Sequence, residues 1–190
     1  MSRNLHDHIL QIASGLFYSH GIKATGIDAI VKASGIAKMS LYKYFPSKDD
    51  LVLAYLHKSA EKMQNMLLVG LAARQCTPRQ KLLLIFEIFA ELIASPEFRG
   101  CPFFNATAEC ADASSPIQQA STAFYESFCT QLTVLAEQAG AQEPAELARQ
   151  LTLLITGALV SGQLQSNSHA MRSAYNAAEV LINCSVDNNR

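Results

Sequence analysis

Long segments without glycine or proline constrain the fold of this chain more than any other feature. The 190 residues include only six prolines and nine glycines, and the segments between them are rich in alanine and leucine. Glycine and proline are the residues least favourable to a helix interior, whereas alanine and leucine favour it. Within these segments apolar residues recur three and four positions apart, which is the spacing of a helix face. The sequence therefore predicts an all-α protein.

Caps and breakers divide the chain into about nine expected helices. Thr25 and Ser47, each followed by acidic residues, are typical of helix starts, and Gly21 is typical of a helix end. We expect helices near residues 5–20, 26–34, 38–44, 48–74, 78–95, 103–111, 116–139, 144–163 and 169–184, a polar loop at 165–168 and a frayed tail at 186–190.

Charge is unevenly distributed about a boundary that we place between residues 47 and 48. Residues 1–50 carry six Lys/Arg and four Asp/Glu, a net charge of +2, whereas residues 51–190 carry nine and twelve, a net charge of −3. Contact with phosphates requires local positive charge, so a basic head on an acidic body favours DNA binding. We expect a DNA-binding domain at 1–47 and a second helical domain at 48–190.

The segment from Thr25 to Phe45 predicts a helix-turn-helix. Two short helices flank a turn that contains Gly35, and Ile30 and Leu41 can pack them together. This leaves part of the second short helix outside the core: Lys38, Met39, Ser40, Tyr42, Lys43 and Tyr44. A major groove about 12 Å wide admits one helix, and such side chains suit phosphates, guanine edges and thymine methyl groups. The alternative is a purely structural helical hairpin.

Fourteen residues between positions 9 and 56 then identify a family. They are Ala13, Leu16, Phe17, Gly21, Thr25, Ile30, Ala33, Gly35, Leu41, Tyr42, Tyr44, Phe45, Lys48 and Leu51. In this pattern the segment resembles the N-terminal domain of the TetR family of bacterial transcriptional regulators, and the run from Leu41 to Leu51 is its most specific part. The segment from Cys101 to Glu109 resembles part of the family more weakly.

The resemblance implies a role for particular residues. Thr25 and Lys48 match positions that contact phosphates, and Lys48 also begins a helix. The six residues of the second short helix match the recognition-helix contacts. Many relatives carry glycine or threonine where Met39 stands, so the base preference of the family does not carry over.

The resemblance further implies a ligand cavity among the fourth to seventh helices. Aromatic and methionine side chains there suit a mostly apolar small molecule. The expected lining residues are Met63, Met66, Phe86, Phe103, Phe104, Asn105, Tyr125 and Phe128. Glu109 is a further polar group in this region. The alternative for these side chains is ordinary core packing.

The eighth and ninth helices carry apolar faces that suit a homodimer. Two such helices from each chain can form a four-helix bundle, although burial within one chain is the alternative. We expect a cytoplasmic, ligand-responsive regulator, a repressor that binds a palindromic double-stranded DNA operator as a homodimer. Effector binding would favour a conformation in which the fourth helix shifts the two recognition helices away from a spacing of about 34–36 Å, one turn of DNA. The alternative function is a small-molecule-binding or thiol-sensing helical protein with a structural N-terminal hairpin.

Other kinds of site have little support in the sequence. His6 and His8 lie two positions apart, so they point to different faces of a helix, and we expect a solvated arm and no metal site. The five cysteines are dispersed, which is typical of reduced thiols, although Arg99 near Cys101 leaves a thiol sensor open. We expect no enzyme activity, no cofactor, no secretory signal and no membrane span.

Overall fold

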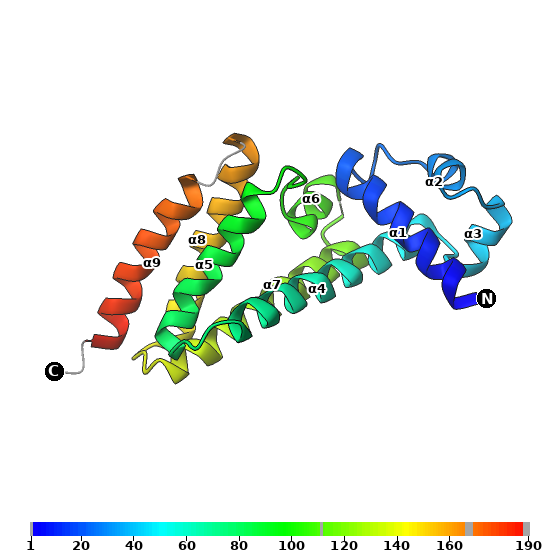
Figure 1. Ribbon diagram of the computed structural model, residues 1–190. Helices are drawn as coiled ribbons and strands as arrows, with labels where there is room; N and C mark the ends of the chain where they lie inside the picture. The colour runs from blue at the N-terminus through cyan, green and yellow to red at the C-terminus, as the bar shows by residue number, and fades with distance from the viewer. Residues whose placement is uncertain (1, 111, 166–168, 188–190) are drawn as a thin grey trace. The chain divides into compact units, whose positions relative to one another are not determined.

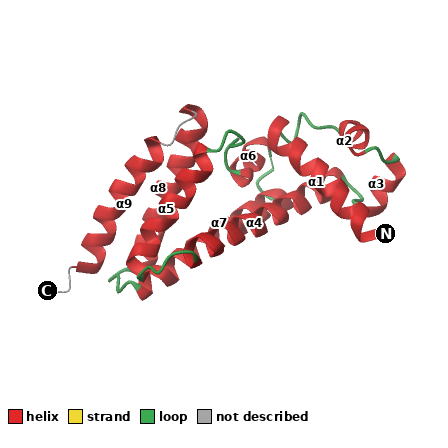
Figure 2. Ribbon diagram, in the orientation of Figure 1, coloured by secondary structure: helices red, strands yellow, loops and turns green. Residues whose placement is uncertain are grey.

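The computed structural model describes residues 2–110, 112–165 and 169–187, and these residues form helices and no strand (Figures 1 and 2). The all-α prediction is confirmed. The helices within the described ranges are α1 (Ser2–His20), α2 (Ile27–Ser34), α3 (Lys38–Tyr44), α4 (Lys48–Ala72), α5 (Pro78–Ala94), α6 (Pro102–Glu109), α7 (Pro116–Gln138), α8 (Pro144–Gln165) and α9 (His169–Asp187).

The helix starts follow from local hydrogen bonding. At the start of α4 the hydroxyl of Ser47 accepts from the backbone N–H of Asp50 at 3.1 Å, and the Asp50 carboxylate accepts from the backbone N–H of Ser47 at 2.9 Å. Thr77 and Gln80 form the same reciprocal pair ahead of α5. Each pair satisfies backbone donors that a helix start would leave without partners, which is why these short sequences define helix boundaries.

Four sequence expectations about helix boundaries are wrong. Thr25 does not cap α2, because Gly26 occupies that position and offers no side-chain bond. Helix α6 ends at Glu109, before residue 111, which lies outside the described residues. Helix α9 runs to Asp187, so the first two residues of the tail predicted at 186–190 are helical, and the other three lie outside the described residues. Of the polar loop predicted at 165–168, Gln165 belongs to α8 and the rest lies outside the described residues.

The chain divides into two compact units that do not follow the order of the sequence. The first comprises Met1–Lys62 and Pro102–Ala123, and the second comprises Met63–Cys101 and Phe124–Arg190. Helices α4 and α7 therefore contribute to both units. The boundary between a DNA-binding domain at 1–47 and a second helical domain at 48–190 stays a prediction.

In the first unit the helices α1, α2 and α3 pack on a small apolar core. Ile9, Ala13, Ile30 and Leu41 are completely buried in it. The ring of His6 stacks on Phe45, with centroids 4.8 Å apart. These contacts hold the short helices α2 and α3, neither of which is long enough to be stable alone.

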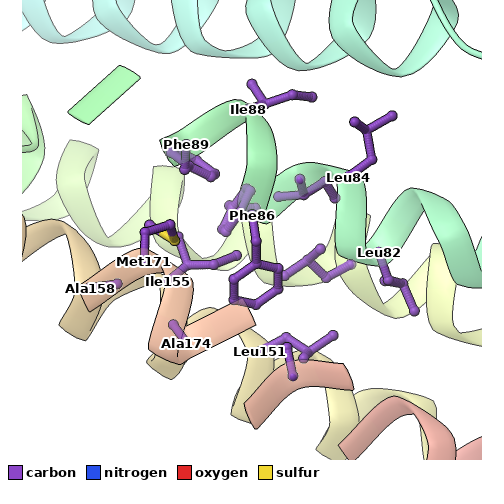
Figure 3. Packing of buried hydrophobic residues seen from close by; sticks show 14 of the residues in the cluster. Leu82, Leu84, Phe86, Ile88, Phe89, Leu151, Ile155, Ala158, Met171 and Ala174 are labelled. Atoms are coloured by element: carbon purple, nitrogen blue, oxygen red, sulfur yellow. The ribbon is translucent and has the colours of Figure 1, made fainter. Parts of the chain in front are cut away.

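In the second unit the helices α5, α8 and α9 lie side by side (Figure 1). Phe86 of α5 is completely buried, and Figure 3 shows it together with Leu151 and Ile155 of α8 and Ala174 of α9. This apolar cluster is the larger of the two cores. Leu67 of α4 and Phe128 of α7 belong to the same cluster.

Candidate nucleic-acid interface

The geometry of the α2–α3 turn sets the orientation of α3. Gly35 adopts the left-handed conformation, with φ 68°, and its N–H bonds to the carbonyl of Val31 at 3.0 Å. A residue with a Cβ adopts this conformation only at a cost, so glycine is the suitable residue for ending α2 here. Ala37, two residues later, is the N-cap of α3. The predicted helix-turn-helix is therefore present.

One face of α3 is open to solvent and carries Lys38, Met39, Tyr42 and Lys43, which we call the α3 face. These residues span about 140° around the helix axis, given 100° per residue. Met39 is 80% exposed, the largest value among the exposed large apolar side chains of this helix. Leu41, on the opposite side, is completely buried. Packing in the first unit thus leaves a continuous polar and apolar surface for another molecule.

Three further predicted contact residues lie outside this face and are less exposed. Ser40 and Tyr44 are half-buried, and the ring of Tyr44 meets His6 edge-on with centroids 6.2 Å apart. Lys48 is half-buried at the first residue of α4.

Thr25 differs from the other predicted contact residues because its side chain is buried. It is 3% exposed, and its hydroxyl donates to the carbonyl of Gly21 at 2.7 Å and of Leu16 at 3.3 Å. The hydroxyl therefore joins the end of α1 to the start of α2. Its predicted phosphate contact stays a prediction.

Sequence reasoning placed Glu109 in a ligand cavity and missed the contact that its carboxylate makes. The two carboxylate oxygens accept from the backbone N–H of Ile22 at 3.0 Å and of Lys23 at 2.5 Å. Gly21, with φ 91°, sits so close that an added Cβ would lie 3.0 Å from the carboxylate. Helix α6 thereby holds the loop that precedes α2, within the same compact unit.

Asp28 is the second polar residue that sequence reasoning missed. Its carboxylate accepts from the Lys38 ammonium at 2.8 Å, which links the first turn of α2 to the first residue of α3. This hydrogen bond, and then the charge of Asp28, raises the pKa of Lys38. A spacing of ten residues across a glycine turn is the only sequence signal for the pair.

The structure gathers only part of the predicted ligand-binding set. Phe86 and Phe128 belong to the core of the second unit, and Met63 and Met66 pack against that core. Tyr125, in the same unit, is exposed. The remaining three belong to the first unit, where Phe103 is buried, Asn105 is half-buried and Phe104 is exposed.

The structure also accounts for the side chains considered for other sites. His6 and His8 are not a solvated arm, because both lie in α1, where His6 stacks on Phe45 and His8 bonds to the carbonyl of Ser34 at 3.1 Å. Among the described residues no three His, Cys, Asp or Glu lie close enough to hold a metal ion. Cys101 is buried, which lowers the reactivity of a thiol. Within the same ranges no helix is long and apolar enough to cross a membrane.

A helix-turn-helix whose second helix presents an open face, together with a larger helical body, defines the class of helix-turn-helix transcriptional regulators. Residues 9–55 match the profile of bacterial regulatory proteins of the tetR family. Residues 78–178, more than half of the chain, match the tetracyclin repressor-like C-terminal domain. The chain belongs to the TetR family. Proteins of this family are DNA-binding transcriptional regulators and not enzymes.

Individual relatives agree with this assignment. Two uncharacterized HTH-type transcriptional regulators of Mycobacterium tuberculosis are 33% identical over 66 residues, which is 35% of this chain and 33% of theirs. The chain thus matches about a third of the length of these two relatives. The HTH-type transcriptional regulator LmrA of Bacillus subtilis is 25% identical over 167 residues, 85% of this chain and 88% of LmrA.

Solved structures show the same fold over nearly the whole chain. The TetR-family regulator SCO4454 from Streptomyces coelicolor has a TM-score of 0.89 at 27% identity, and the match covers 96% of each chain. NemR of E. coli in its reduced form has a TM-score of 0.83 at 20% identity, with 93% of this chain and 96% of NemR covered.

Proposed function

We propose that this protein is a ligand-responsive transcriptional repressor that binds a palindromic operator as a homodimer. The observation that carries the proposal is the α3 face, where Lys38, Met39, Tyr42 and Lys43 stand exposed on the second helix of a helix-turn-helix. Such a helix enters the major groove of DNA. Because the target is chromosomal DNA, we further propose a cytoplasmic location.

The side chains of this surface have complementary roles. Tyr42 and Lys43 supply a hydroxyl and an ammonium for phosphates, and Met39 supplies an apolar contact for a thymine methyl group. Lys48 binds a phosphate from the first residue of α4. Ser40 and Tyr44 add contacts from positions of α3 outside this face, and Thr25 contributes by ordering the loop before α2.

The test is a salt-dependent gel shift on the DNA that flanks the gene for this protein. Replacement of Tyr42 or Lys43 by alanine should weaken binding without unfolding the protein, because both side chains belong to the open face of α3. Lys48→Ala should weaken binding to all sequences about equally and reduce the salt slope by about one. Full affinity in all three variants would overturn the assignment of α3.

For the homodimer, α8 and α9 provide the surface. Leu153, Val160 and Leu164 are exposed on α8 at spacings that place them on one side of the helix, and Val180 is exposed on α9. Exposed apolar side chains in a row favour burial against another copy of the same helices. A symmetric dimer presents two α3 helices to the two halves of a palindrome.

The residues that test the dimer follow from their exposure. Leu159 of α8 is unsuitable, because it is buried within its own chain. Leu153→Glu combined with Leu164→Glu should convert the dimer to monomers in sedimentation experiments. Leu68→Glu on α4 is a matched control, since Leu68 is 68% exposed and Leu153 is 67% exposed. A dimer that survives the double change while the protein stays folded would refute this interface.

For the effector, we propose a mostly apolar small molecule that binds in the second unit near Met63, Met66 and Tyr125. Aromatic and methionine side chains favour such a ligand. Binding of effector and operator must be antagonistic and reciprocal, with a coupling of about 1–3 kcal/mol, or 5–150-fold in affinity. Calorimetric titration of uncharged aromatic compounds, with and without operator DNA, tests this proposal. A compound with equal affinity in both titrations is not an inducer.

A further inference from the structure

Lys38 of α3 and Asp28 of α2 form a hydrogen-bonded pair in which the ammonium donates and the carboxylate accepts. The ammonium nitrogen of Lys38 lies 2.8 Å from a carboxylate oxygen of Asp28. The side chain of Lys38 is 52% exposed and that of Asp28 is 83% exposed, so both remain accessible to another molecule while they are paired. Lys38 begins α3, and the first residues of a recognition helix are those that reach base edges.

We propose that Asp28 and Lys38 together read one G·C base pair in each operator half-site. The inference rests on the proposed function, because it assumes that α3 enters the major groove. It goes further, since it assigns a base preference to a carboxylate that lies outside α3.

The chemistry of the base edges favours G·C over A·T. A lysine ammonium has three donors, and the bond to Asp28 uses one of them. The other two donors match N7 and O6 of guanine, which are adjacent acceptors in the major groove. The second oxygen of Asp28 can accept from N4 of the paired cytosine. In an A·T pair the two acceptors are separated by a donor and followed by the thymine methyl group, so the ammonium can bind only one of them.

The charge of Asp28 also argues against a phosphate contact at this position. A lysine that binds phosphate releases counterions, whereas Lys38 is already neutralised by a carboxylate that phosphates would repel. The alternative is that Asp28 has only a structural role, in which its negative charge in the first turn of α2 stabilises that helix through the helix dipole. That alternative predicts no effect of Asp28 on base preference, so the two readings are distinguishable.

The experiment is a selection of binding sites from a random duplex DNA library with the full-length chain. We expect the wild-type protein to enrich sites with one G·C pair per half-site whose replacement by A·T lowers affinity about 5–150-fold. Lys38→Met should reduce that penalty to less than about 3-fold, because it removes both contacts to guanine. Asp28→Ala should reduce the penalty by a smaller factor, because it removes the contact to cytosine and leaves Lys38 able to bind guanine. Replacement of the guanine by 7-deazaguanine should weaken binding of the wild-type protein and leave Lys38→Met unaffected.

Lys43→Ala is the matched control, since it removes a charge from the same face without breaking the pair. It should weaken binding to all sites and keep the full G·C penalty. A penalty that persists in both Asp28→Ala and Lys38→Met, with native melting temperatures, would overturn the inference and leave the proposed function intact. A wild-type protein that enriches no sequence would instead overturn the proposed function, and the inference with it.

Discussion

Replacement of Glu109 by alanine should loosen the loop between α1 and α2 and lower the stability of the protein. The carboxylate accepts from the backbone N–H groups of Ile22 and Lys23, at 3.0 and 2.5 Å. A hydrogen bond to a charged group contributes about 1.5–3 kcal/mol, and less where water can replace the lost partner. Since the Lys23 bond is exposed and the Ile22 bond is partly buried, we expect a total of about 2 kcal/mol.

That magnitude corresponds to a decrease of about 4–8 °C in melting temperature for a chain of this size. Amide hydrogen exchange locates the effect. The amides of Ile22 and Lys23 should exchange faster, whereas the amide of Gly21, which bonds to the carbonyl of Phe17 at 3.0 Å, should keep its protection. Because the loop leads into α2, the variant should also bind operator DNA more weakly.

Glu126→Ala provides a control for the loss of one negative charge, since Glu126 is an exposed residue of α7. It should leave both the melting temperature and the exchange of the loop amides unchanged. The reasoning about Glu109 fails if its alanine variant has unchanged exchange at Ile22 and Lys23, because those two donors would then not depend on the carboxylate.

Three further outcomes are expected. Phe86→Ala should lower the free energy of unfolding by about 3–5 kcal/mol in denaturant titrations, whereas alanine at Phe104, which is 37% exposed, should cost less than that, and equal costs would contradict the assigned core. Thr25→Val should lower the free energy of unfolding by about 1 kcal/mol, because valine has a similar shape but lacks the buried hydroxyl that donates to the carbonyl of Gly21. A neutral result in the same titration would refute that hydrogen bond. Asp28 raises the pKa of Lys38, so the contribution of this pair to stability is present below the ordinary lysine pKa and is lost as the pH rises through the raised one. Asp28→Ala should return the pKa of Lys38 toward its ordinary value in an NMR titration, and an unchanged pKa would exclude the pair in solution.

Most of the fold could be predicted from the sequence because its boundaries depend on local chemistry. Ser47 and Pro78 mark the starts of α4 and α5, and Gly21 and Gly35 follow the ends of α1 and α2. Each of these residues acts through its own backbone or through neighbours three to five positions away. The division into two compact units depends instead on contacts between distant segments, and no local pattern indicates that residues 102–123 group with residues 1–62.

The candidate site was predictable only in part, for the same reason. Leu41 as a core residue sets which side of α3 is exposed, so the α3 face follows from helical spacing. Threonine is a common residue at helix starts, yet the hydroxyl of Thr25 bonds to the carbonyl of Gly21, at the end of α1. The contact of Glu109 with the loop spans 86 and 87 residues along the chain, so spacing arguments cannot find it. Phe86 shows that an aromatic side chain expected in a cavity can equally fill a core.

Site-directed photo-cross-linking tests most directly the central claim that the α3 face binds operator DNA. Met39 is 80% exposed, so p-benzoylphenylalanine at this position should leave the fold intact. We predict that it cross-links to a base in the major groove of a selected operator, and that the same residue placed at Leu68, which is 68% exposed on α4, does not. A protein that binds the operator with full affinity but cross-links to it from Leu68 and never from Met39 would contradict the account.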